Sequence, residues 1–222
     1  MDTKILFTEK EIKKAIDFAR SIKWKHGCFS DKANKNIDNR TDAEVYVSIL
    51  RGKLAEIALK KYLQEKHKDS KHKIAGLDFN IYKRGICDEF DLKFDRYTIS
   101  IKSSKMFASC LFVEKDKYET DYFGNPISIE GHDGGIPDFY AFVKVKIDMN
   151  KINDSYAQIC GAISHNDFWR MKKELPRGTY INKNNMDNLF INNKSVSELK
   201  DTSGTKLLAT SYCLHLDLLR QI

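Results

Sequence analysis

The stretch Asp88–Lys105, DEFDLKFDRYTISIKSSK, contains two short runs in which apolar and polar residues alternate on either side of Asp95-Arg96. Alternation with a period of two predicts β-strands, and a two-residue polar connection between them predicts an antiparallel hairpin. In that hairpin Leu92 pairs with Ile99, because the residue numbers of opposed positions have a constant sum. This hairpin sets the fold class that we expect for the chain.

One face of the predicted hairpin collects polar groups of three kinds. The register sets Asp91 opposite Ser100, and Lys102 lies diagonally beside Asp91. Because side chains alternate across a strand, these three residues share one face while Leu92 and Ile99 share the other. A carboxylate, a hydroxyl and an ammonium group therefore meet on this face, which makes it the first candidate for a functional site.

Length and composition indicate one domain with a basic surface. The chain has 222 residues, of which 41% are hydrophobic, and this is enough for a substantial core. A net charge of +7 and a pI near 9.0 favour an acidic partner, of which nucleic acid is the commonest. A solvated lysine surface would give the same charge, so the charge alone assigns no partner.

Cysteine usage and the N-terminus favour a soluble cytoplasmic protein with no membrane partner. The five cysteines show no CxxC spacing, which argues against a zinc cluster and against a disulfide framework. Free thiols are typical of a reducing cytoplasm. The N-terminal residues lack the apolar run of a signal peptide, and no part of the sequence has the apolar length of a membrane span.

Two capping-box signatures predict helix starts, one at Thr8 and one at Thr41. Apolar residues then recur at helical spacing as far as Trp24 in the first helix and Leu63 in the second. Glu56 lies within the second pattern among apolar neighbours, at the edge of the expected buried stripe. An isolated glutamate there is ordinarily a boundary residue, and a nearby metal site would change that interpretation.

Further strand and helix patterns follow the hairpin, and the order of all the patterns predicts an α/β fold with a mixed central β-sheet flanked by helices. Asp138–Ile147 and Tyr156–Ile163 have the apolar composition of central strands. The remaining predictions are strands at Leu77–Tyr82 and within Phe107–Tyr118, a loop or flap over Asp121–Pro137, a helix over Asp167–Glu174, a loop over Asn182–Asn193 around a strand at Leu189–Ile191, a helix start in Ser195–Leu199, and an apolar helix or strand over Leu207–Leu219.

The chain resembles the PD-(D/E)xK nuclease superfamily, to which many type II restriction endonucleases belong, in the order of three residues. These are a glutamate on a helix, an acid on the first arm of the next hairpin, and a lysine on its second arm, in ISIKSS. The resemblance covers roughly residues 50–105, with Asp138–Ile147 as looser support. It implies a restriction-endonuclease-like sheet in a single nuclease domain over residues 1–222, with a helical N-terminal part at 1–75, a catalytic sheet at 76–165 and C-terminal helices and loops for DNA recognition at 166–222.

The resemblance also implies a role for each residue. Asp91 would be the carboxylate ligand of a divalent ion, and Glu56 would hold the ion or its water from the helix. Lys102 would activate the attacking water and stabilise charge on the phosphate. Mg²⁺ is the expected ion, because it prefers oxygen ligands and lowers the pKa of its bound water. The implied activity is site-specific cleavage of double-stranded DNA by a homodimer from a bacterial or phage-like host.

Ser100 departs from the family pattern, which usually has Asp or Glu two residues before the lysine. Glu56 is our preferred replacement, because its helical context is well defined. Asp116 is an alternative, since some restriction enzymes with serine at this position take the acid from further along the chain, and Asp88 is a third candidate. A structure-selective resolvase or repair nuclease and a catalytically decayed DNA-binding protein remain alternative functions.

Other motifs in the chain are interpreted as structural. Pro137-Asp138 precedes an apolar strand in which no acid stands two residues before a lysine, so it is not the family motif. His132 and His165 each lack a second histidine at metal-ligand spacing and are predicted loop residues, and His67 and His72 are predicted to be solvated. The sequence has no GxxxxGK[ST] motif, which favours a stand-alone enzyme over a motor subunit.

Overall fold

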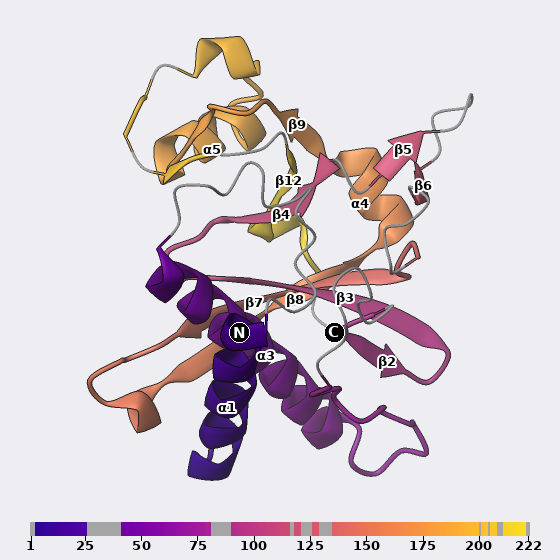
Figure 1. Cartoon of the computed structure of the whole chain (residues 1–222). Helices are drawn as coiled ribbons and strands as arrows, with labels where there is room; N and C mark the ends of the chain where they lie inside the picture. The colour runs from indigo at the N-terminus through magenta and orange to yellow at the C-terminus, as the bar shows by residue number, and fades with distance from the viewer. Residues whose placement is uncertain are drawn as a thin grey trace.

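The computed structural model describes residues 3–25, 41–80, 90–115, 118–120, 126–128, 135–199, 201–203, 205–207 and 211–220. The chain is an α/β protein built on a five-stranded, mixed and curled sheet with the strand order β1-β8-β7-β3-β2 (Figure 1). β3 and β7 are parallel, and the other neighbours are antiparallel. The strands are β1 (Thr3–Leu6), β2 (Leu92–Phe94), β3 (Tyr97–Ser104), β7 (Phe139–Lys146) and β8 (Tyr156–Ser164).

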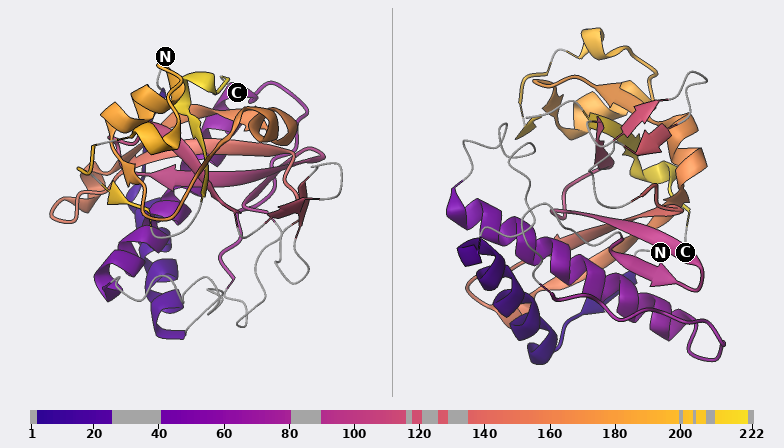
Figure 2. Two further views of the ribbon diagram at one scale, coloured as in Figure 1. Left: turned by 90° about the horizontal axis from the view of Figure 1, so that it is seen from above. Right: turned by 45° about the vertical axis from the view of Figure 1, so that its right-hand side comes forward.

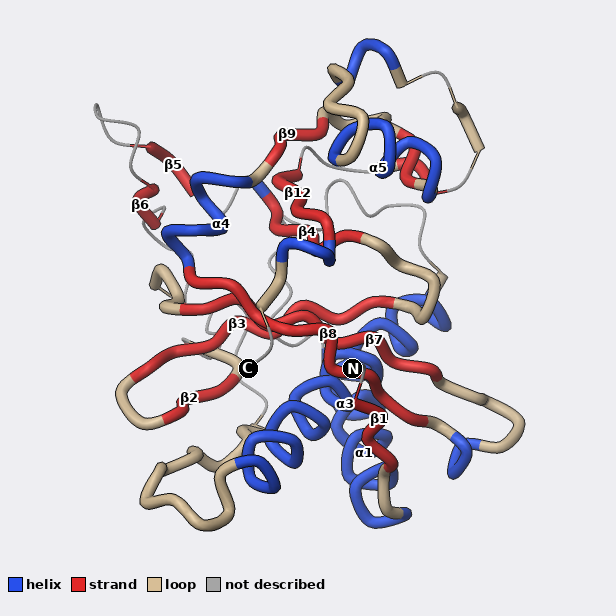
Figure 3. Tube along the Cα trace, turned by 180° about the vertical axis from the view of Figure 1, so that it is seen from behind, coloured by secondary structure: helices blue, strands red, loops and turns tan. Residues whose placement is uncertain are grey.

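Two helices, α1 (Glu9–Lys25) and α3 (Asp42–Lys66), cover one face of this sheet (Figures 1 and 3). Both predicted capping boxes form. At the start of α3 the N–H of Thr41 donates to Glu44 Oε2 at 2.8 Å, and the N–H of Glu44 donates to Thr41 Oγ1 at 3.3 Å. None of the described helices combines the length and the apolar character needed to cross a lipid bilayer.

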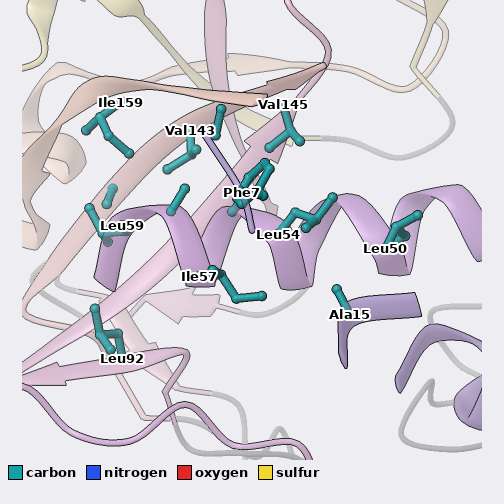
Figure 4. Packing of buried hydrophobic residues seen from close by; sticks show 14 of the residues in the cluster. Phe7, Ala15, Leu50, Leu54, Ile57, Leu59, Leu92, Val143, Val145 and Ile159 are labelled. Atoms are coloured by element: carbon teal, nitrogen blue, oxygen red, sulfur yellow. The ribbon is translucent and has the colours of Figure 1, made fainter. Parts of the chain in front are cut away.

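β7 is buried on both faces, as its composition predicts, and it separates two hydrophobic cores. Val143 and Val145 point toward the helices and pack with Leu54 of α3, as Figure 4 shows. Tyr140 and Phe142 point to the other face and join a second core. Since successive side chains of a strand alternate, one apolar strand supplies both cores.

A second, three-stranded antiparallel sheet covers the other face of the main sheet (Figure 2). Its strand order is β4 (Cys110–Glu114), β12 (Ser211–His215) and β9 (Lys173–Leu175). Helix α4 (His165–Met171) packs Phe168 into the core between the two sheets. The prediction of a mixed central sheet flanked by helices is therefore correct for the mixed sheet and for the face covered by α1 and α3, while a small antiparallel sheet covers the other face. The remaining elements are β4 (Cys110–Glu114), β5 (Tyr118–Thr120), β6 (Pro126–Ser128), η2 (Ile152–Asp154), α4 (His165–Met171), β9 (Lys173–Leu175), β10 (Tyr180–Ile181), α5 (Lys183–Phe190), η3 (Val196–Glu198), β11 (Thr205–Lys206), β12 (Ser211–His215) and η4 (Leu216–Leu218).

The asparagine-rich segment Asn182–Asn193 contains the helix α5 (Lys183–Phe190) and not the predicted loop around a strand. Asn182 caps α5, because its Oδ1 accepts the N–H of Asn185 at 2.7 Å. Met186 and Leu189 are then spaced to face a small core together. Frequent asparagine suggested a loop, but the cap and this apolar pair favour a helix.

The prediction of a strand at Leu77–Tyr82 is also wrong for its described part, residues 77–80, which have no regular structure. Lys53 of α3 donates to the carbonyl oxygen of Asp78 at 2.8 Å, so this backbone is tied to the helix. The N-terminal part is not entirely helical, because β1 pairs with β8 in the main sheet. The sequence did not predict β1, because its four residues, TKIL, do not alternate clearly between apolar and polar side chains.

Three predicted elements are correct in part. Asp121–Pro137 contains strand β6, paired with β5, and the rest of its described residues, 135–137, are irregular. The helix predicted at Asp167–Glu174 begins earlier, at His165, and gives way to β9. Leu207–Leu219 contains strand β12 followed by the short turn η4.

Gly161 lies at a bulge in β8, next to the bridge between Ala162 and Arg220. It has a φ of +135°, and a Cβ atom there would lie 2.5 Å from the carbonyl oxygen of Arg220. That carbonyl accepts the N–H of Ala162 at 2.8 Å, so it has little freedom to move. We expect Gly161→Ala to lower the free energy of unfolding by more than about 2 kcal/mol in urea titrations.

Gly52→Ala is the matched control. Gly52 lies inside α3, and a Cβ atom added there would meet nothing within 4 Å, so the same substitution should stabilise the protein by about 0.5–1 kcal/mol. Equal effects of the two substitutions would contradict this account of Gly161.

Candidate functional site

The β2–β3 hairpin has the register that the sequence predicts. Leu92 pairs with Ile99 and Phe94 pairs with Tyr97. Asp95, in the two-residue turn, has a φ of 52°, a conformation that aspartate tolerates better than most residues. Leu92 and Ile99 are buried in the core that they share with α3. The polar face of the hairpin is therefore the opposite one.

Asp91 lies immediately before β2, and its carboxylate takes the place of a strand neighbour for β3. Its Oδ2 accepts the backbone N–H of Ile101 at 2.5 Å and the hydroxyl of Ser100 at 3.4 Å. Within the described part of the chain, Asp91 Oδ1 accepts no hydrogen bond. One oxygen is thus fixed by backbone, and the other has lone pairs for a cation or a donor.

Ser100 and Lys102 share the face of β3 that points away from α3. In the parallel pairing Ser100 is opposite Tyr140 and Lys102 is opposite Phe142, and both aromatic residues belong to the second core. Ser100 and Lys102 are half-buried. The structure therefore brings Asp91 to Ser100, with Lys102 next along the same face of the strand.

Glu56 has a different environment. Its carboxylate forms an ion pair with Lys53 on the same helix at 2.6 Å, with the two side chains only 13% and 6% exposed. Lys53 Nζ also lies 4.5 Å from the centre of the Phe18 ring. Since α3 packs on the Ile99 face of β3, Glu56 stands on a helix across the sheet from Ser100. These contacts give Glu56 a structural role in α3, and its part in binding a metal stays a prediction.

Asp138, of the Pro137-Asp138 pair, connects the starts of the two parallel strands. Its Oδ2 accepts the N–H and the hydroxyl of Thr98 at 2.7 and 2.8 Å, and its own N–H donates to Thr98 Oγ1 at 3.0 Å. Through these hydrogen bonds Asp138 sets the register between β3 and β7 at the start of the pair. This role agrees with the sequence interpretation of Pro137-Asp138 as structural.

His165 is a buried residue at the start of α4, so the prediction of a loop residue is wrong. The hydroxyl of Tyr140 donates to that of Tyr118 at 2.9 Å and lies 3.1 Å from His165 Nδ1. Burial lowers the pKa of His165 and favours the neutral ring. This network adjoins Ser100, whose strand partner is Tyr140. The helix-capping signal Ser164 before Asp167 could have indicated it.

His72 is not simply solvated, as the sequence interpretation held. Its Nδ1 is bound to Asp95 Oδ2 in the hairpin turn. The backbone N–H of Lys73 and this histidine together lower the pKa of Asp95. The ring of His67 packs on both His72 and Phe94. These contacts anchor the tip of the hairpin to the end of α3.

The described residues offer only part of a metal site. Among them no three His, Cys, Asp or Glu side chains form a group that could hold a metal ion. Mg²⁺ is often bound through one or two carboxylates, with water and substrate phosphate as the other ligands. Asp91 supplies one carboxylate, which is the smaller of these two numbers. Asp88 and Asp116, the other acids considered from the sequence, lie outside the described residues.

Comparisons with protein-family models, with curated proteins and with solved structures find no match to this chain. Any inference about the reaction that this chain catalyses therefore depends on the residues of the hairpin and their geometry.

The ion pair of Glu56 predicts an effect on stability. Glu56→Ala leaves the nearly buried ammonium of Lys53 without its carboxylate, and we expect a loss of about 3 kcal/mol in unfolding free energy. The double variant Lys53→Met/Glu56→Leu removes both charges and should recover most of the loss in the same urea titrations. A fully stable Glu56→Ala protein would refute the structural role.

The contacts of Asp138 also give a prediction about stability. Asp138→Ala removes two hydrogen bonds to Thr98 at an exposed position, so we expect a loss of about 1 kcal/mol with the fold retained. Thr98→Val removes the hydroxyl from the same contact and should have an effect of the same size. Thermal unfolding of the two single variants and of the double variant measures the coupling, and additive losses would show that the residues act independently.

Proposed function

We propose that this chain is a Mg²⁺-dependent endonuclease that hydrolyses phosphodiester bonds of double-stranded DNA, with a site of the PD-(D/E)xK type. The observation that supports it most is the arrangement of the hairpin. Ser100 donates to Asp91 at 3.4 Å, and Lys102 is the next residue on the same face of β3. The proposal gives each of these three residues a part in phosphodiester hydrolysis.

Asp91 is the metal ligand in this proposal. The N–H of Ile101 fixes Oδ2 at 2.5 Å, so the carboxylate is held by backbone rather than by a mobile side chain. Its Oδ1 faces no donor among the described residues and is the oxygen that would bind the ion. When bound, Mg²⁺ lowers the pKa of a coordinated water and offsets negative charge at the phosphate.

Lys102 is the cationic group of the site. A lysine in the interior of a paired strand has a fixed backbone, so its ammonium can be directed at one phosphate oxygen. There it would orient the attacking water and stabilise the charge that develops in the transition state. The Ser100 hydroxyl orients Asp91, and Glu56, Asp88 or Asp116 would supply the acid that the family usually has at the position of Ser100.

A type II restriction enzyme is the form of this function that we favour. Cutting both strands of a symmetric DNA site requires two active sites, which a homodimer with two-fold symmetry supplies. The net charge of +7 favours binding to the phosphate backbone. A structure-selective nuclease would use the same chemistry on branched DNA.

A catalytically decayed DNA-binding protein is the second candidate function, and two observations favour it. Ser100 stands where the family usually has an acid, and Glu56 is held in an ion pair with Lys53. Such a protein would retain the basic surface and bind DNA without cutting it.

Cleavage of DNA by site variants tests the proposal. In Mg²⁺ buffer, the wild-type protein should cut unmodified plasmid DNA into discrete fragments, and EDTA should abolish cutting. Asp91→Asn and Lys102→Met should each lower the rate by about 100-fold or more, because each removes a charge from the site. Lys93→Met is the matched control, since Lys93 is an exposed lysine of the same hairpin, and it should keep near wild-type activity.

The outcomes separate the three functions. Cutting of branched DNA alone would favour the structure-selective nuclease, and DNA binding without any cutting would favour the decayed protein. Undiminished cutting by Asp91→Asn would overturn our assignment of the site. Glu56→Gln, Asp88→Asn and Asp116→Asn, assayed in parallel with a check of folding, identify the acid that replaces the one missing at Ser100.

A further inference from the structure

Four strands of the main sheet, β1, β3, β7 and β8, have lysine as their only charged residue type. Together they contain Lys4, Lys102, Lys144 and Lys146, and none of the four strands contains an aspartate or a glutamate. The whole chain has 31 acidic residues, so acids are common elsewhere in it. The charge within these four strands is therefore entirely positive.

The lysines lie on one face of the sheet, the face turned away from α1 and α3. Lys144 and Lys146 alternate along β7 with Val143 and Val145, and both valines pack in the core with α3. Because side chains alternate along a strand, the two lysines lie on the opposite face. Lys102 lies on this same face of β3, since its strand neighbour Phe142 belongs to the second core.

A single row of side chains crosses all four strands on this face. Ser104 of β3 is opposite Lys144 of β7. Lys144 is opposite Gln158 of β8, and Gln158 is opposite Lys4 of β1. Opposed residues share a face, and strands lie about 4.8 Å apart, so the row is about 14 Å long. We call these four residues the lysine row.

The lysine row lies beyond the part of the main sheet that the second sheet covers. Tyr140 and Phe142 are buried in the core between the two sheets, whereas Lys144 is half-buried and Lys146 is exposed. Lys4 is also exposed. β7 and β8 extend past the second sheet to the turn that joins them (Figures 1 and 3). The row can therefore meet a ligand from solvent.

The ammonium groups of the row are not neutralised by carboxylates. In the described part of the chain, Lys4, Lys144 and Lys146 form no ion pair. Instead, Nζ of Lys4 lies 4.3 Å and Nζ of Lys146 lies 5.7 Å from the centre of the Tyr156 ring. A ring attracts an ammonium group and leaves its charge in place. These charges remain available to an anionic partner.

Asp148, in the turn after β7, is an acid close to one end of this surface. Its Oδ1 accepts the N–H groups of Asn150 and Lys151 at 3.0 Å each. These hydrogen bonds lower the pKa of Asp148, and the charges of Lys146 and Lys151 lower it further. The ionised carboxylate offsets part of the charge of Lys146, so Lys4 and Lys144 should contribute most to binding.

We propose that the lysine row binds the phosphate backbone of double-stranded DNA and leads the duplex to the hairpin site. The choice of DNA as the partner rests on the proposed function. At about 3.4 Å of helix axis per nucleotide, a row of about 14 Å spans about four phosphates of one strand. Lysine, serine and glutamine side chains all donate to phosphate oxygens. Ser104 follows Lys102 on the same face of β3, so the row begins beside the proposed catalytic lysine.

DNA binding without divalent ions tests the proposal. A fluorescein-labelled duplex is titrated with the full-length protein in EDTA and followed by fluorescence anisotropy. Lys4→Gln/Lys144→Gln should weaken binding about 10-fold at about 50 mM salt. It should also reduce the slope of log K against log salt concentration by about 1.8, since each phosphate contact contributes about 0.9. Duplexes of different sequence should show the same loss, because phosphate contacts do not read bases.

Lys10→Gln/Lys13→Gln is the matched control. Both lysines are exposed on α1, which covers the opposite face of the sheet, and the variant loses the same charge. It should keep the wild-type affinity and the wild-type salt slope. Circular dichroism of each variant verifies that it is folded.

Equal losses in the two double variants would overturn the proposal, because they would show that net charge alone governs binding. Wild-type protein that binds vesicles of phosphatidylserine and phosphatidylcholine, and not DNA, would also refute it.

The binding assay also separates this proposal from the nuclease function. Wild-type protein that binds DNA through the row and cuts none of it would support the row and refute the nuclease. Normal cutting together with undiminished binding by folded Lys4→Gln/Lys144→Gln would support the nuclease and refute the row.

Discussion

The parallel pairing of β3 with β7 is the constraint on which the rest of the structure depends. It joins the hairpin to β7, a strand that contributes to both cores, and aligns Ser100 with Tyr140. Because alternation is strict along a strand, this register directs Ile99 to the helical core and the polar side chains of β3 to the opposite face. A slip of one residue would exchange the two faces and bury Lys102 against α3. The hydrogen bonds between Thr98 and Asp138 prevent that slip at the start of the pair.

The same arrangement explains why the acids of the chain have different roles. Asp91 immediately precedes β2, so its carboxylate can bind the N–H of Ile101 and keep one oxygen for a ligand. Glu56 comes from a helix surrounded by apolar side chains, where the ammonium of Lys53 has been removed from water. A nearly buried ammonium requires a nearby anion, and this requirement competes with any role of Glu56 in binding a metal. The metal chemistry proposed for the hairpin therefore depends on Asp91 first.

Elements with strong local signals were predicted well. The capping boxes and the helical spacing of apolar residues located α1 and α3, and the alternation around the turn at Asp95 gave the hairpin register. These predictions succeeded because neighbours in the sequence decide a cap, a turn and a period. The helix α5 and the irregular residues 77–80 were mispredicted, since their structures depend on a small core around Met186 and on a contact from Lys53 to Asp78.

Alternation and a two-residue turn in the sequence were enough to assign Asp91, Ser100 and Lys102 to one side of a hairpin, because a strand and a tight turn are decided by neighbouring residues. What surrounds that hairpin came from the packing of distant segments: the lysine beside Glu56 and the buried ring of His165 against Tyr140. Each of these is set by how a side chain packs once helices and sheets have come together. Burial and charge pairing of this kind follow from the packing of the layers, which residue spacing along the chain does not encode.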